Sequence, residues 1–144
     1  MLVTLITVCY NSANTIENTL KSVFSQTYKN IEYLIVDGSS SDGTMRILSR
    51  YKNKIDKIIS ESDEGLYFAL NKGLANSNGE IIGFVHSDDI LFDRNVINDV
   101  VEIFSSNDAD IIWGDLVINN RKTGIPKRIY NGGKINRNSF DIGI

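Results

Sequence analysis

The sequence has few of the residues that cross-link small proteins. Its 144 residues include one cysteine, Cys9, and one proline. A single cysteine excludes an internal disulfide and a zinc site built from several cysteines, and it fits a reducing compartment. The fold must therefore rest on a hydrophobic core. A single domain of this length can bury about two thirds of the surface of its unfolded chain, which is enough to form a hydrophobic core.

Long hydrophobic runs are also missing. Apolar segments such as residues 80–86 are short and interrupted, so none is long enough to span a bilayer. No signal peptide precedes the first apolar run at residues 3–8, which predicts a cytoplasmic protein. Hydrophobic residues make up 42% and charged residues 23% of the chain. This composition is typical of a folded globular domain and excludes a disordered chain.

Acidic residues dominate the first part of the chain and basic residues the last. Residues 1–118 contain 9 Lys and Arg against 17 Asp and Glu, a net charge of -8, whereas residues 119–144 contain 6 against 1, a net charge of +5. An acidic main body repels a phosphate backbone, so we expect no nucleic-acid partner. The basic tail favours contact with a diphosphate or with an anionic membrane surface, as in a peripheral membrane protein.

Apolar periodicity predicts strands that alternate with helices along residues 1–118. Runs rich in β-branched residues predict strands at 3–8, 31–36, 55–60, 81–85 and 111–113, with 116–118 as a candidate continuation of the last. Apolar stripes predict helices at 16–24, 47–51, 66–74 and 97–104. This alternation predicts an α/β fold, a mostly parallel sheet with helices on both faces. Residues 119–144 lack periodicity and are predicted to form a separate, irregular segment.

Polar residues follow each predicted strand. Ligands bind beyond the carboxyl ends of parallel strands, because loops and helix amino termini converge there. The candidate site residues from the four loops in chain order are Tyr10 and Asn11, then Asp37, then Asp63, then His86, Asp88 and Asp89. Adjacent carboxylates such as Asp88 and Asp89 repel each other unless a cation or protons relieve them. A divalent Mg²⁺ or Mn²⁺ bound together with a nucleoside diphosphate is therefore the expected ligand.

Each of these residues also has a structural interpretation. Asp37 can accept from a uracil imide or a ribose hydroxyl, or it can form an Asx turn that holds the serine-rich loop after it. Tyr10 can stack on a base or sugar, or it can lie partly buried in the core. Asp88 or Asp89 can cap a turn. The sequence leaves these alternatives open.

Other functional motifs are absent or incomplete. No two glycines have the spacing of a dinucleotide-binding fingerprint, and residues 38–44 have the glycine spacing of a P-loop without its lysine. Cys9 and His86 could form a thiol nucleophile with its base, but no third group orients the histidine, and a small core thiol is the favoured interpretation. A receiver-like signalling domain would need acidic residues after the first strand, where Tyr10 and Asn11 stand instead.

Six motifs in consistent order resemble those of family 2 glycosyltransferases. They are Thr7–Ile16 (TVCYNSANTI), Ser22–Tyr28 (SVFSQTY), Leu34–Thr44 (LIVDGSSSDGT), Asp63–Tyr67 (DEGLY), Ala69–Gly73 (ALNKG) and His86–Asp89 (HSDD). Several motifs in order are far more specific than any one of them. The resemblance covers residue 1 to about residue 118. It implies the nucleotide-binding half of a GT-A fold, with residues 119–144 as the start of an acceptor-binding part.

The resemblance also implies an activity and a set of site residues. The donor would be a nucleoside-diphosphate sugar, most often a UDP-sugar, transferred with inversion to a glycan or lipid-linked acceptor. The resemblance implies that Tyr10, Asp37 and Asp63 bind the base and ribose, with Asn11 beside them. It implies that Asn71 and Lys72 line the nucleotide pocket. It also implies that Asp88 contacts the sugar or ribose, and that Asp89 binds Mn²⁺ or Mg²⁺ together with Asp88.

The general base of an inverting reaction has no match in the sequence. After Asp89, the basic tail offers only Asp141 as an acidic residue. The alternative is therefore a non-catalytic nucleotide-binding or assembly module.

Overall fold

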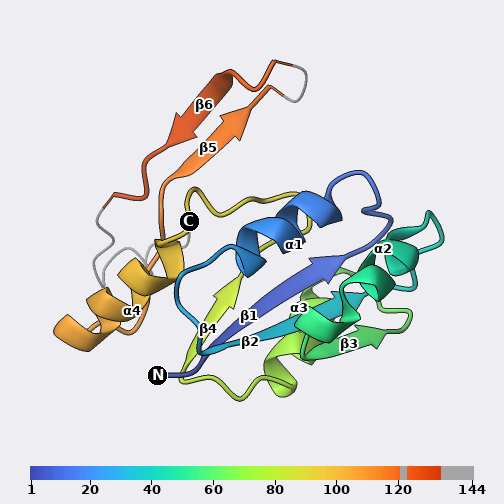
Figure 1. Ribbon diagram of the computed structural model, residues 1–144, viewed down its shortest axis with the longest axis horizontal. Helices are drawn as coiled ribbons and strands as arrows, with labels where there is room; N and C mark the ends of the chain where they lie inside the picture. Colours follow the sequence, from blue (N-terminus) through green and yellow to red (C-terminus); the bar gives the residue numbers. More distant parts are fainter. Residues whose placement is uncertain (121–122, 134–144) are drawn as a thin grey trace. The chain divides into compact units, whose positions relative to one another are not determined.

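The computed structural model describes residues 1–120 and 123–133, and Figure 1 shows how their helices and strands follow one another. The chain divides into two compact units, Met1–Ser106 and Asn107–Ile144. The predicted boundary at residue 118 falls within a strand of the second unit.

The first unit is built on a parallel sheet. Its four strands are β1 (Val3–Cys9), β2 (Ile31–Asp37), β3 (Lys57–Ser60) and β4 (Ile81–Phe84). They lie in the order β3-β2-β1-β4, and all three pairings are parallel (Figure 1). The chain moves outward from β1 to β3 and then returns to the other side of β1. Such a reversal opens a crevice at the carboxyl ends of the two flanking strands.

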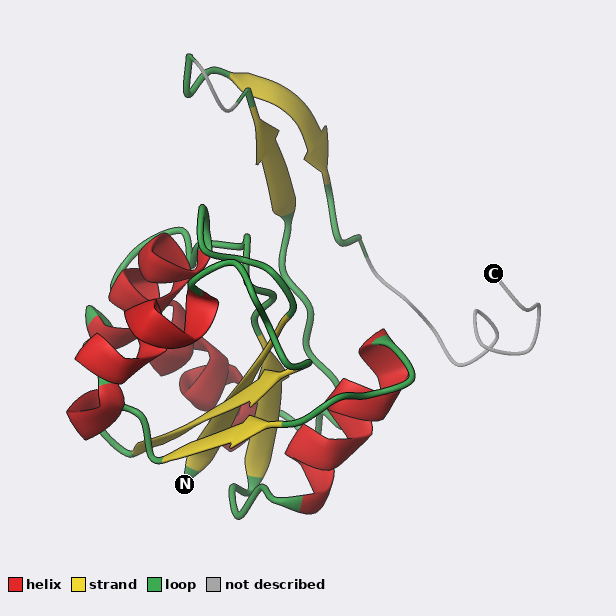
Figure 2. Cartoon of the chain, turned by 90° about the vertical axis from the view of Figure 1, so that its right-hand side faces the viewer, coloured by secondary structure: helices red, strands yellow, loops and turns green. Residues whose placement is uncertain are grey.

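Helices cover both faces of this sheet, as predicted (Figure 2). They are α1 (Ile16–Phe24), α2 (Thr44–Arg50), the short 3-10 helix η1 (Lys52–Lys54), α3 (Leu66–Ala75) and α4 (Val96–Ser106). None of the helices in the described part of the chain combines the length and the apolar character that a transmembrane span requires.

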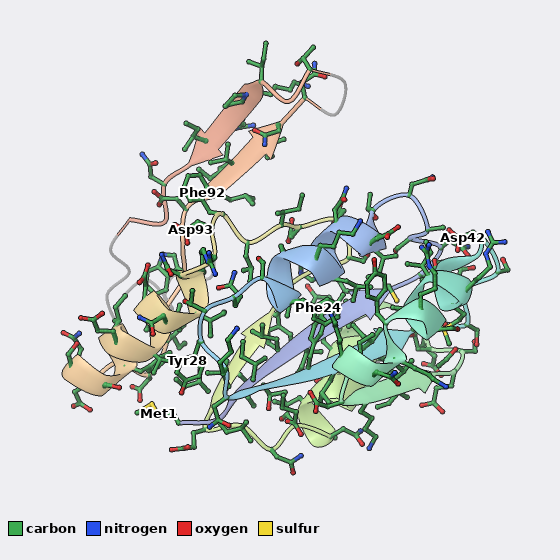
Figure 3. All side chains as sticks on the ribbon, viewed as in Figure 1. Met1, Phe24, Tyr28, Asp42, Phe92 and Asp93 are labelled. Atoms are coloured by element: carbon green, nitrogen blue, oxygen red, sulfur yellow. The ribbon has the colours of Figure 1, made fainter. Side chains whose placement is uncertain are left out.

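Alternating side chains of the central strands form two cores. On one face, Leu5 and Ile35 pack in one cluster with Leu20 of α1 and Leu48 of α2. On the same face lies Phe24, which is labelled in Figure 3. Its ring centroid is 5.8 Å from that of Tyr33 and 5.7 Å from that of Tyr51. On the other face, the buried cluster consists of Ile6, Val8, Leu34 and Val36 with Ala69 of α3. Successive strand residues point to opposite faces, so two cores follow from continuous apolar strands.

The second unit contains an antiparallel hairpin of β5 (Leu116–Asn119) and β6 (Pro126–Tyr130). β6 lies in the segment that the sequence pattern predicted to be irregular. The prediction of a strand at residues 111–113 was wrong, because these residues form a loop at the base of the hairpin. There, Trp113 Nε1 donates to the Gly132 carbonyl at 2.7 Å, and the Gly132 N–H donates to Asp115 Oδ1 at 2.7 Å.

Candidate functional site

A pocket of about 600 Å³ opens at the carboxyl edge of the sheet in the first unit. The loops after all four strands line it, together with the beginning of α3, and the residues that matter for its chemistry are Tyr10, Gly38, Asp63, Leu66, His86 and Asp88. Its volume lies in the range of ligand-binding clefts, roughly 300 to 1,000 Å³. The pocket therefore stands at the edge where the sequence predicted a ligand.

Tyr10 and Asp63 lie close together on one wall of this pocket. Asp63 Oδ1 accepts from the Gly65 N–H at 2.9 Å, which fixes the carboxylate at the start of α3. A Cβ at Gly38 would lie 3.2 Å from Asp63 Oδ2 and 3.4 Å from Tyr10 Cδ2. The bare backbone at Gly38 thus lets both side chains approach, and Tyr10 keeps 67% of its surface exposed. An aromatic ring and a carboxylate therefore line the same part of the pocket.

Asp37 is buried, and hydrogen bonds occupy both of its carboxylate oxygens. Oδ2 accepts from the Ser40 N–H at 3.1 Å and from Ser60 Oγ at 2.7 Å, while Oδ1 accepts from Ser40 Oγ and lies 3.6 Å from Cys9 Sγ. The side chain does not line the pocket. Asp37 therefore joins β1, β2, β3 and the loop after β2. This agrees with the interpretation that Asp37 holds the serine-rich loop that follows it.

Cys9 faces the same buried carboxylate. Burial, and then the negative charge of Asp37, raise the pKa of the Cys9 thiol far above its usual range. A thiol held in its neutral form is a poor nucleophile. The structure thus favours Cys9 as a core thiol over a Cys9–His86 dyad, although His86 also lines the pocket.

Asn11 joins the loop after β1 to the loop after β2. Its backbone has a φ of 50°, a left-handed conformation that asparagine tolerates. Its Oδ1 accepts from the Ser41 N–H at 2.9 Å, and Asp42 in turn accepts from the Ala13 N–H at 2.9 Å (Figure 3). Asn11 does not line the pocket. Its contacts fix the backbone next to Tyr10.

Ser12 and Ser87 form a link that sequence reasoning missed. Their hydroxyl oxygens lie 2.9 Å apart and join the loop after β1 to the loop after β4. The Ser12 N–H also donates to Thr44 Oγ1 at 2.8 Å, and the Thr44 hydroxyl donates to Asp42 Oδ1 at 2.6 Å. Hydrogen bonds from Thr44, and then from the Ala13 backbone, hold the pKa of Asp42 below its usual range. The serines are 75 positions apart, and no sequence signal pairs them.

Asn71 and Lys72 of α3 do not line the pocket. Lys72 Nζ forms an ion pair with Glu61 Oε1 at 3.0 Å, which ties α3 to the segment after β3. Asn71 is exposed. Of the residues predicted to bind the donor, the structure thus brings Tyr10, Asp63 and Asp88 to the pocket wall, and it places Asn11, Asp37, Asn71 and Lys72 outside it.

Asp88 and Asp89 follow β4 in a turn closed by the Asp89 N–H, which donates to the His86 carbonyl at 3.0 Å. Asp88 lines the pocket, whereas Asp89 is half-buried and is not among the residues that line it. Across the described residues, no three His, Cys, Asp or Glu side chains form a group that could hold a metal ion. Mg²⁺ and Mn²⁺ are often held by one or two carboxylates and complete their shells with phosphate oxygens and water. The donors present fit a metal shared with a nucleotide rather than one caged by protein.

Comparison with known proteins connects this pocket to a family. Residues 4–142 match the sequence pattern of glycosyl transferase family 2. The chain is 33% identical over 114 residues to an uncharacterized glycosyltransferase of Mycobacterium tuberculosis, MT1564, and the match covers 78% of this chain and 44% of that protein. The chain thus spans less than half of the length of this relative.

Two solved structures that resemble this chain were determined in complex with a nucleotide sugar. Residues 1–349 of Staphylococcus aureus TarS, in complex with UDP-GlcNAc, are 26% identical with a TM-score of 0.72, and the match covers 88% of this chain and 37% of that one. The mannosyltransferase PcManGT from Pyrobaculum calidifontis, in complex with GDP-Man and Mn²⁺, is 26% identical with a TM-score of 0.67, over 84% of this chain and 36% of that one. The chain belongs to glycosyltransferase family 2, and its first unit is the N-terminal part of a GT-A fold.

Proposed function

We propose that this chain provides the donor-binding part of a metal-dependent, inverting glycosyltransferase that uses a UDP-sugar and a glycan or lipid-linked acceptor. The observation that carries the proposal is the pocket at the carboxyl edge of the sheet, where Tyr10, Asp63 and Asp88 converge from three different loops. The likeness to TarS, which was solved with UDP-GlcNAc, supports a uridine nucleotide as the ligand.

Each wall of the pocket suits one part of such a donor. The exposed Tyr10 ring offers an apolar face on which a base can stack. The nearby Asp63 carboxylate can accept from the imide N–H of uracil or from a ribose hydroxyl. Asp37, whose oxygens are already hydrogen-bonded, acts by holding the loop that carries Gly38.

Asp88, which lines the pocket, and the adjacent Asp89 would hold Mg²⁺ or Mn²⁺. The bound metal would neutralise the charge that develops on the diphosphate leaving group. The Ser12–Ser87 hydrogen bond fixes the residue next to Asp88 and so limits the positions that its carboxylate can take. No residue is assigned as the general base, and Asp141, the one acidic residue of the basic tail, lies outside the described residues.

Calorimetric titration with UDP, in Mn²⁺ and in EDTA, tests the nucleotide site. Asp88→Asn and Asp89→Asn should each lower UDP affinity in Mn²⁺ by about tenfold or more, because a charge-assisted ligand is lost, and should leave binding in EDTA unchanged. Asp99→Asn is the matched control, since Asp99 is an exposed acid on α4. Tyr10→Ala should weaken binding under both conditions. Equal affinities for the parent and all four variants would refute the site.

UDP release from a panel of UDP-sugars tests turnover separately. Release that requires Mn²⁺ and is lost in Asp89→Asn supports a transferase. Tight UDP binding without release from any sugar would instead support the alternative, a non-catalytic nucleotide-binding module.

A further inference from the structure

The turn at residues 88–89 lies in the loop between β4 and α4, and this loop runs along α1 (Figure 1). Just before the turn, the Ser87 hydroxyl oxygen lies 2.9 Å from that of Ser12, which precedes α1. Just after it, the Leu91 N–H donates to Ser22 Oγ of α1 at 3.2 Å. The turn is therefore held on both sides by α1 and the residues that lead into it.

Gln26, which follows the end of α1, holds the rest of this loop. Its side chain is buried, with 2% of its surface exposed. Nε2 donates to the Asp93 carbonyl at 2.6 Å and to the Ser22 carbonyl at 3.2 Å, while Oε1 accepts from the Ile97 N–H at 3.1 Å. One side-chain amide thus joins the loop and the first turn of α4 to α1.

The partners of Gln26 require an amide. Two of them are carbonyl oxygens, which need donors, and the third is a backbone N–H, which needs an acceptor. A side-chain amide supplies both kinds of group, whereas a carboxylate only accepts. The first N–H groups of a helix have no partner within that helix, so Gln26 also caps α4 through Ile97. Without the amide, buried backbone groups would lose their partners, and the loop would have to shift to satisfy them.

Thr27 extends this contact along the loop. Its N–H donates to the Arg94 carbonyl at 2.7 Å, and its Oγ1 lies 3.0 Å from the same carbonyl oxygen and 3.0 Å from Asn95 Oδ1. Residues 90–95 form neither helix nor strand. The path of the chain between the turn and α4 therefore depends on side chains at the carboxyl end of α1.

We propose that Gln26 is a positioning residue for the metal-binding turn at Asp88 and Asp89. This role rests on the proposed function, since it concerns the same metal site. Gln26 does not line the pocket at the carboxyl edge of the sheet. It acts through the backbone of the loop, which sets where the two carboxylates stand. Loss of a group that orients metal ligands lowers metal affinity by roughly 10- to 100-fold.

Calorimetric titration with UDP, in Mn²⁺ and in EDTA, tests this role. Gln26→Met keeps the length of the side chain and removes its hydrogen bonds, so UDP affinity in Mn²⁺ should fall about tenfold or more, with binding in EDTA unchanged. Tyr33→Phe is the matched control, because it breaks another buried hydrogen bond of the first unit, that of Tyr33 with Thr7 at 2.9 Å. The control should lower the melting temperature and keep parent-like UDP affinity under both conditions.

Hydrogen–deuterium exchange of the UDP-free chain follows the loop itself. In Gln26→Met, peptides that cover residues 86–97 should exchange faster than in the parent, whereas those that cover β2 should not change. Thr27→Val keeps the backbone donor to Arg94 and should show both effects to a smaller degree. Thr27→Val also keeps the proposal testable if Gln26→Met does not fold.

Several results would overturn the proposal. Parent-like UDP affinity in Mn²⁺ for Gln26→Met and Thr27→Val, or unchanged exchange of residues 86–97, would do so and leave the proposed function intact. Equal losses in Mn²⁺ and in EDTA, or an equal loss in Tyr33→Phe, would show that Gln26 serves the stability of the fold alone. If the parent did not bind UDP, the proposed function would be wrong and the positioning role would fall with it.

Discussion

β1 of the first unit and β5 of the second each contain consecutive β-branched residues, yet their surroundings are opposite. All seven residues of β1 are buried, whereas every residue of β5 and β6 is exposed. The strands of the first unit alternate with helices that bring apolar stripes to both faces of the sheet. In the described part of the second unit, the hairpin has only its own two strands. Strand propensity makes a strand, but burial requires a neighbouring element.

Replacing an isoleucine by alanine should destabilise the first unit far more than the second, and this is the largest of the expected effects. Ile35→Ala on β2 removes a side chain that is fully buried, and we expect it to lower the free energy of unfolding by about 2 to 5 kcal/mol. Ile118→Ala on β5 removes one that is 40% exposed, and the expected change is within about 0.5 kcal/mol. Urea unfolding followed by circular dichroism measures both. Similar losses in the two variants would show that the hairpin is buried in solution.

This contrast also explains which parts of the fold were predictable. Periodicity in a sequence reports burial, and β1 was therefore predicted at residues 3–8 and found at Val3–Cys9. β6 begins at Pro126 and carries Lys127 and Arg128, and neither of its faces is buried. A strand without a buried face leaves no alternation of polar and apolar residues to detect.

The position of the pocket at the carboxyl edge of the sheet was predictable, but the hydrogen-bond partners of the polar residues around it were not. That Asp37 ends a strand is visible in the sequence. Its partners are not, because they depend on the register that pairs Cys9 with Asp37 and Asp37 with Ser60. The same holds for Ser12 and Ser87, which meet only because β1 and β4 are neighbours. The sequence shows which polar residues lie at the carboxyl edge of the sheet. Which of them form hydrogen bonds with one another depends on how the strands pair.

Asp37→Ala should give the next largest effect. It would leave the Ser40 N–H and the Ser60 hydroxyl without their acceptor, at an expected cost of about 1 to 3 kcal/mol in the free energy of unfolding. UDP affinity should fall as well, since the loop that carries Gly38 loses its anchor. Asp37→Asn keeps one acceptor oxygen and should lie between the parent and Asp37→Ala. Chemical unfolding and UDP titration of the three proteins check this order, and unchanged stability of Asp37→Ala would contradict the anchoring role.

Gly38→Ala should weaken UDP binding more than it weakens the fold. The added methyl group would press on Asp63 Oδ2 at 3.2 Å and reach van der Waals contact with Tyr10 Cδ2, and we expect a loss of about 1 kcal/mol in binding, roughly fivefold. Gly114→Ala in the second unit is the matched control, because no atom lies within 4 Å of a Cβ added there. Calorimetry should therefore give parent-like UDP affinity for Gly114→Ala. Equal effects of the two alanines would show that Tyr10 and Asp63 do not bind the nucleotide.

Acid should loosen the loops of the first unit through Asp42, and this is the smallest of the expected effects. Hydrogen bonds from Thr44, and then from the Ala13 backbone, hold the pKa of Asp42 below its usual range. A carboxylate with a lower pKa in the folded state adds stability above its unfolded value of about 3.9 and loses it as the pH falls through the folded value. The melting temperature of Asp42→Asn should thus lie below that of the parent at neutral pH and approach it as the pH falls below about 3.9. A constant difference between Asp42→Asn and the parent across this range would mean that the charge of Asp42 does not stabilise the loop, and that its hydrogen bonds act through geometry alone.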